Sequence, residues 1–181
     1  MGNVHESITD ELKEFAESQP MFFVATAPSE GGHVNVSPKG LESVVVLGPH
    51  EVAYIDRTGS GVETIAHVQQ NGRITLMFCA FKGGPNIVRF AGKGEVIWPD
   101  DERFVGLEAR FPPTPAVRAI IRIDVDRVSD SCGYGVPIME FKNDRRALDG
   151  WAANKTLDDI SAYQQQKNTT SIDGIPGVPP A

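Results

Sequence analysis

The sequence has few cysteines and no excess of basic residues, and each shortage excludes a class of protein. Only two cysteines occur in 181 residues, Cys79 and Cys132, and they form no CxxC pair. A disulfide framework and a structural zinc site are therefore not expected, and both cysteines are interpreted as reduced thiols. Lys and Arg number 17 against 24 Asp and Glu, a formal net charge of −7. Because nucleic-acid-binding domains concentrate basic charge, we expect no nucleic-acid partner.

Patterns for metal binding and membrane insertion are also absent. The four histidines show neither HxxxH nor HxH spacing; they are His5, His33, His50 and His67. We therefore expect no metal site. No apolar run approaches the roughly 20 residues that span a bilayer, and the acidic N-terminal segment does not resemble a signal peptide. The sequence thus predicts a cytoplasmic protein with no membrane partner.

Short apolar runs bounded by turn residues are what the chain does contain. The expected strands cover residues 21–27, 33–37, 43–48, 51–57, 73–81, 86–98 and 116–132. The first four follow one another at hairpin distances, which predicts an antiparallel meander. One stretch, from Gly59 to Gly72, has helical spacing instead, with Ser60 as a candidate N-cap. Seven strands, one inserted helix and no βαβ alternation predict a closed or split antiparallel barrel.

The remaining segments are predicted to be helical or irregular. Expected helices cover residues 7–18 with a Thr9 cap, 100–111, an irregular stretch from 138 to 151, and 156–167 with a Thr156 cap. The tail SIDGIPGVPPA is too rich in Gly and Pro for regular structure, so it should lie along the surface or hang free. We expect a single domain over residues 1–181, with the barrel at about 21–132 and a C-terminal extension at about 138–181.

The segment from Tyr54 to Thr64 is the most informative for function, because an expected strand enters Gly59-Ser60-Gly61 and a helix follows at once. Glycines let backbone N–H groups approach an anion, and a helix N-terminus favours negative charge. The pattern is compatible with a phosphate site. On sequence alone, an ordinary flexible turn with Ser60 as N-cap is the commoner alternative. The segment lacks the Lys of a P-loop and the spacing of a GxGxxG motif.

Two basic residues are further candidates for phosphate contacts. Lys39 lies in the NVSPKG segment, where a solvated turn lysine is the alternative. Arg89 lies in an expected strand, and any of the many carboxylates is an alternative partner for it. No Ser-His-Asp order, Cys-His pair or carboxylate pair stands out, so no catalytic residue is assigned. A phosphate-compatible turn without such a constellation suggests that a cofactor carries the chemistry.

Four ordered blocks of the sequence resemble the pyridoxamine 5′-phosphate oxidase-like superfamily of flavin-binding split barrels. The blocks read FFVATA, VNVSPKG, VAYIDRTGSGVETIAHVQQNGRITLMFCAF and IVRFAGKGEVI. The resemblance implies a mainly β (α+β) fold, namely an antiparallel six-stranded split β-barrel with an inserted helix and C-terminal helices. It also implies a homodimer with FMN bound in a groove between the protomers.

The resemblance further implies which residues contact the cofactor. The strand from Asn35 to Lys39 would flank the flavin ring, with Ser37 and Lys39 reaching the flavin or its phosphate. The residues expected around the ribityl phosphate are Asp56, Arg57, Ser60, Gly61 and Thr64. Arg89 is expected to be a further contact.

Two departures from the family pattern bear on the substrate. Pyridoxamine phosphate oxidases proper place an Arg-Lys pair at the start of the helix, where this chain has Val62 and Glu63. They also end in a segment with Arg and Trp that closes over the substrate, whereas IDGIPGVPPA contains neither residue. Efficient oxidation of vitamin B6 phosphates is therefore not expected.

These observations predict an FMN-dependent oxidoreductase acting on an unidentified small molecule, with NADH or NADPH as candidate reductants. One alternative is a deazaflavin-dependent reductase on the same fold, whose longer anionic tail would favour a more basic groove. The other is a non-catalytic flavin- or haem-binding module. His67 is the candidate haem ligand, although a histidine in this amphipathic helix is expected to face solvent.

Overall fold

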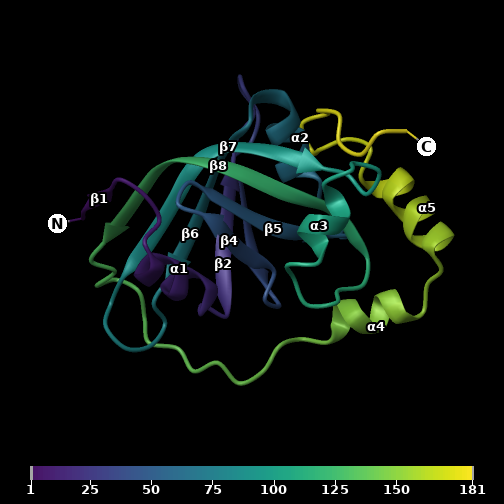
Figure 1. Ribbon diagram of the computed structural model, residues 1–181. Coiled ribbons are helices and arrows are strands. Elements are labelled where there is room, and N and C mark those ends of the chain that lie inside the picture. Colours follow the sequence, from purple (N-terminus) through teal and green to yellow (C-terminus); the bar gives the residue numbers. More distant parts are fainter. Residues whose placement is uncertain (1, 181) are drawn as a thin grey trace.

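The computed structural model describes residues 2–180 and consists of one antiparallel sheet with five helices around it (Figure 1). The strands are β1 (Val4–His5), β2 (Met21–Thr26), β3 (Asn35–Gly40), β4 (Val44–Gly48), β5 (Glu51–Arg57), β6 (Arg73–Cys79), β7 (Ile87–Ile97) and β8 (Val117–Ser131). The helices are α1 (Asp10–Glu17), α2 (Glu63–Asn71), α3 (Phe104–Glu108), α4 (Ala147–Ala153) and α5 (Leu157–Lys167).

The strand order shows that the barrel is split. Neighbouring strands follow the order β3-β2-β6-β7-β8-β5-β4, and β1 adds to β8. Although β3 and β4 are consecutive in the chain, they lie at opposite ends of this order and do not pair. The predicted four-strand meander is therefore wrong at this point: β2–β3 and β4–β5 are separate hairpins. The split leaves β3 with a free edge, and the candidate site lies beside it.

The predicted mainly β split barrel is confirmed, with eight strands in place of six. The short strand β1 was not predicted from the sequence, because two residues are too few to show the alternation of apolar and polar residues that indicates a strand. The pairing of β7 with β8 is interrupted by a register shift between Ala91 and Gly92. A Cβ at Gly92 would collide with the carbonyl group of Asp124 on β8, so glycine permits this close approach.

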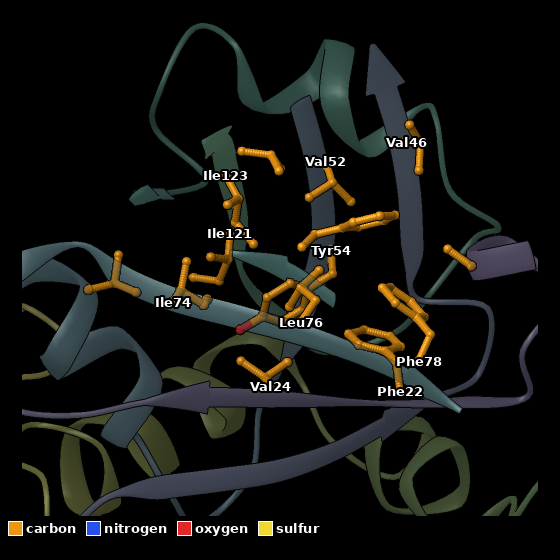
Figure 2. Packing of buried hydrophobic residues seen from close by; sticks show 14 of the residues in the cluster. Phe22, Val24, Val46, Val52, Tyr54, Ile74, Leu76, Phe78, Ile121 and Ile123 are labelled. Atoms are coloured by element: carbon orange, nitrogen blue, oxygen red, sulfur yellow. The ribbon is translucent and has the colours of Figure 1, made fainter. Parts of the chain in front are cut away.

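The interior of the barrel is filled by side chains from β2, β4, β5, β6, β7 and β8 (Figure 2). Phe22 stacks on Phe78 with ring centroids 5.4 Å apart, and Phe78 in turn contacts Phe90. The residues of β6 alternate between buried and half-buried positions. A single chain therefore buries one face of this mostly apolar strand fully and the other face only in part. Truncating Phe78 to Ala would cost about 3–5 kcal/mol, because the cavity left could not collapse.

The observed helices match the predicted ranges best where a side chain caps the helix N-terminus. Thr9 caps α1, and Thr156 forms a capping box with Asp159 at α5. In contrast, α3 spans five residues, and the expected irregular helix from 138 to 151 is helical only over α4. The chain between β8 and α4 is extended and crosses the bottom of the view in Figure 1. Within residues 2–180, no helix is both long and apolar enough to cross a membrane.

The C-terminal tail lies along the surface, one of the two expected courses, and it is held there firmly. Asn168 and Ser171 are buried, and Val178 joins the main hydrophobic cluster together with Val62. A single bridge joins Thr170 to Pro176. The tail therefore packs against the start of α2, which brings it next to the candidate site (Figure 1).

Candidate functional site

A small cavity of about 160 Å³ lies where the end of β5, the Gly59–Gly61 turn and the first turn of α2 meet β3. It is lined by Ser37, Lys39, Asp56, Arg57, Gly59, Gly61, Val62, Glu63, Thr64 and Arg118. Six of these were expected from the family resemblance to contact the flavin or its phosphate: Ser37, Lys39, Asp56, Arg57, Gly61 and Thr64. They come from three elements that are separate in the chain, namely β3, the end of β5 with its following turn, and the first turn of α2.

A buried carboxylate organises the cations of this cavity. Asp56 is 1% exposed, and its two oxygens face different partners. Its Oδ1 lies 3.1 Å from Nζ of Lys39, and its Oδ2 accepts from Nε of Arg118 at 2.7 Å. Arg118 also donates from Nη1 to the carbonyl oxygen of Gly61 at 2.9 Å. The ion pairs thus tie β3, β5 and β8 to the turn.

The ionisation states in this cluster follow from burial and charge. Burial alone would raise the pKa of Asp56, but the positive charges of Lys39 and Arg118 hold that pKa below its usual value. Asp56 is therefore ionised at neutral pH. Burial raises the pKa of the neighbouring Tyr54 well above its usual value, so its phenol stays neutral. Nζ of Lys39 lies 5.7 Å from the centroid of the Tyr54 ring.

The charges lining the cavity leave one cation in excess. Three cations line it, namely Lys39, Arg57 and Arg118, and two carboxylates, namely Asp56 and Glu63. The third cation, Arg57, pairs with Asp149 of α4 at 2.6 Å, a carboxylate that does not line the cavity, so each of the three cations has a carboxylate partner. Three cations are enough to contact one phosphate group but few for a long polyanionic tail.

A chain of hydrogen bonds connects the polar residues of β3 with α2. Asn35 donates from Nδ2 to the hydroxyl oxygens of Thr64 at 3.0 Å and Thr26 at 3.2 Å. The hydroxyl of Ser37 donates to Oδ1 of Asn35 at 2.9 Å. Nδ1 of His67 lies 3.0 Å from the Thr26 hydroxyl. The expectation that His67 faces solvent is wrong: the side chain is 0% exposed, because its face of α2 packs on β2.

The turn that leads into α2 is held differently from the prediction. Ser60 is not the N-cap, since α2 begins at Glu63 with Val62 in the cap position and no side-chain cap. Instead, Nδ2 of Asn168 in the tail donates to the carbonyl oxygens of Gly59 at 2.9 Å and Ser60 at 3.4 Å. The tail and Arg118 hold the turn from two sides, and the helix starts two residues later than expected. Gly72 ends it in the left-handed conformation, as expected.

Three of the nine predicted contact residues lie outside the small cavity. Asn35 and Ser60 line an adjoining open cavity together with Gly61 and Ile172. Arg89 lies on β7, where it donates to the Ser131 hydroxyl at 3.0 Å and lines neither cavity. The structure therefore does not bring Arg89 to the others.

Two residues of the site had not been predicted from the sequence. Arg118 is one of several basic residues in the β8 segment, and nothing in the local pattern distinguishes it from its neighbours. Asn168 follows α5, more than 100 residues from the turn that it holds. Both act through contacts between distant segments, which a reading of local patterns cannot detect.

Comparison with known proteins agrees with the family resemblance noted in the sequence. Residues 8–132 match the family described as pyridoxamine 5′-phosphate oxidase. The chain is 42% identical over 191 residues to the pyridoxamine 5′-phosphate oxidase family protein ustO of Aspergillus flavus, covering 96% of this chain and 77% of that protein.

Solved structures with lower identity share the fold. HupZ of Group A Streptococcus is 23% identical with a TM-score of 0.52, covering 67% of this chain and 91% of that one. The FAD binding protein of Mycobacterium smegmatis is 13% identical with a TM-score of 0.50, covering 71% and 96%.

Proposed function

This chain belongs to the pyridoxamine 5′-phosphate oxidase family, and on that premise we propose that it is an FMN-dependent oxidoreductase acting on a small molecule. The observation that carries the proposal is the small cavity beside the Gly59–Gly61 turn, in which Lys39, Arg57 and Arg118 converge. Cations, hydroxyl groups and a turn at a helix start are the groups that bind a phosphate monoester.

The residues present fit the phosphate end of FMN. The cavity of about 160 Å³ is smaller than the roughly 300–1,000 Å³ of sites that enclose whole ligands, so it would take the phosphate and leave the ring outside. The three cations that line the cavity attract the phosphate, and the hydroxyl group of Thr64 is a further donor. A deazaflavin cofactor has a longer anionic tail, for which three cations that already pair with carboxylates supply too little positive charge.

Each residue of the cluster has a distinct part in this proposal. Lys39 and Arg118 attract the phosphate, and Asp56 holds both side chains in place while ionised. Asn35 orients the Thr64 hydroxyl from β3. When bound, FMN supplies the capacity to accept and donate a hydride or single electrons, while the protein orients the ring and controls access to it.

The proposal includes a homodimer, because the free edge of β3 carries exposed apolar side chains. Val36 is 59% exposed and lies on the opposite face of β3 from Asn35 and Ser37, and Val34, immediately before the strand, is 71% exposed. A second copy would cover this face and complete a groove for the ring. The dimer should persist in size-exclusion chromatography at dilution, with an interface above about 2,000 Å². A dilute monomer that retains flavin would contradict the shared groove.

Two measurements test the proposed function. Purified protein should release FMN on heat denaturation, identified by chromatography against FMN, FAD and riboflavin standards. The FMN-loaded protein should then lose its flavin absorption bands when NADH or NADPH is added without oxygen. Binding of FMN without any reduction would indicate a flavin carrier, and a Soret band in place of flavin bands would indicate a haem protein.

A further inference from the structure

A second, larger cavity of about 690 Å³ adjoins the candidate phosphate site. Lys39 lines both cavities, so the second one adjoins the candidate phosphate site at this residue. Its volume is within the range of sites for small molecules. The apolar side chains that line it come from four separate segments; they include Met21, Pro38, Leu41, Phe81, Met139 and Leu148.

One wall of this cavity is formed by residues 139–145 of the extended chain between β8 and α4, together with Ala147 and Leu148 at the start of α4 (Figure 1). The backbone N–H of Met139 donates to the carbonyl oxygen of Phe81 at 2.8 Å. Beyond the wall, Asp149 pairs with Arg57, which lines the phosphate cavity. The wall is therefore fixed at both ends, and one anchor is a residue of the proposed flavin site.

The opposite wall includes a strained turn between β3 and β4. Leu41 has φ 63° and Glu42 has φ 52°, a conformation that is sparsely populated for residues other than Gly, Asn and Asp. Such strain often persists at ligand sites, where the surrounding structure fixes it. Here the strained turn places the Leu41 side chain on the cavity wall.

The charges around the cavity cancel. Two carboxylates and two cations of the extended wall line it, namely Glu140, Asp144, Lys142 and Arg145. The remaining cation, Lys39, is paired with the buried Asp56. An anionic substrate would therefore find no surplus positive charge, whereas an apolar one would bury surface against the six side chains named above.

We propose that this cavity is the substrate pocket of the flavin site and that it accepts an uncharged, mainly apolar small molecule. The assignment as a substrate pocket rests on the proposed function. The ligand class rests on the lining itself, so the two are testable separately.

The test is equilibrium binding of three probes to the oxidised, FMN-loaded protein by isothermal titration calorimetry. The probes are menadione, 1,4-naphthoquinone-2-sulfonate and pyridoxine 5′-phosphate, which compare an uncharged bicyclic ring with a charged one and with a phosphorylated ring. Menadione is expected to bind at least about tenfold more tightly than either anion, since only the anions must leave water with an uncompensated charge.

Two variants locate the binding. Leu41→Asn keeps a residue that tolerates the left-handed turn but removes the apolar side chain, and Met139→Glu places a charge in the wall. Each should weaken menadione binding to the FMN-saturated protein at least about fivefold. Val105→Glu is the matched control, because Val105 is 72% exposed on α3 and lines neither cavity.

The outcomes separate the two proposals. Equal affinity for menadione and the sulfonate, no measurable menadione binding, or unchanged binding in both variants would overturn the assignment of the pocket. A protein that takes up no FMN would contradict the proposed function instead. The same titration of the flavin-free protein would then still decide which ligand class this cavity accepts.

Discussion

Replacing Asp56 by Asn tests the charge arrangement of the candidate site. The substitution keeps the shape of the side chain but removes the negative charge between Lys39 and Arg118. Because the Arg118 side chain is only 4% exposed, its charge would be left buried without a partner, and the flavin-free protein should lose about 3–5 kcal/mol of unfolding free energy. Two charge-assisted hydrogen bonds, at about 1.5–3 kcal/mol each, give a similar range.

The same variant should respond to FMN in a distinctive way. A bound phosphate supplies a new negative charge next to the two cations, so FMN should restore more stability to Asp56→Asn than it adds to the unmodified protein. Riboflavin, which lacks the phosphate, should not. Urea unfolding without ligand, with FMN and with riboflavin measures all three states.

A surface ion pair provides the control for this experiment. Glu51 pairs with Arg122 at 2.6 Å, but both side chains are partly exposed. Glu51→Gln should therefore cost no more than about 1 kcal/mol and should show no dependence on FMN. Equal stabilisation of Asp56→Asn by FMN and riboflavin would refute the reasoning, because the phosphate would then lie elsewhere.

Three further predictions concern the same region. Thr64→Ala should weaken FMN binding by about 0.5–1.5 kcal/mol and leave riboflavin binding unchanged; equal losses for both ligands would argue against a phosphate contact. Burial lowers the pKa of His67, so unfolding free energy should hold above about pH 6.5 and fall as the pH drops toward the pKa of the folded state. His67→Gln should flatten this slope in urea unfolding at pH 5 and pH 8, and an unchanged slope would disprove the role of His67. Steady-state assays with pyridoxine 5′-phosphate should give kcat/KM below ~10⁴ M⁻¹s⁻¹, and a higher value would show that the substrate site was misread.

The elements of the barrel were largely predictable because each has a strong local signal. β5 and β6 alternate or run apolar between turn residues, and α5 begins at a capping box. The pairing of strands was less accessible. β3 and β4 are joined by a short turn, yet they do not pair with each other. They lie at opposite ends of the strand order, and a reading of neighbouring segments does not predict that order.

The candidate site was predictable only where one segment supplies it. The Gly59–Gly61 turn and the NVSPKG strand have sequence patterns of their own, and the structure places them together. Arg118 and Asn168 reach the turn from β8 and from the tail, and no spacing rule connects such distant positions. The burial of His67 was missed for the same reason: the helix alone does not indicate that β2 covers it.

The most direct test of the flavin assignment is a titration of the flavin-free protein with FMN and, separately, with riboflavin. Binding is measured as the quenching of flavin fluorescence. FMN should bind with a Kd of about 1 μM or tighter, equivalent to about −8 kcal/mol, and riboflavin at least about tenfold more weakly. Failure to bind FMN under conditions where haem or a deazaflavin binds would contradict the central claim.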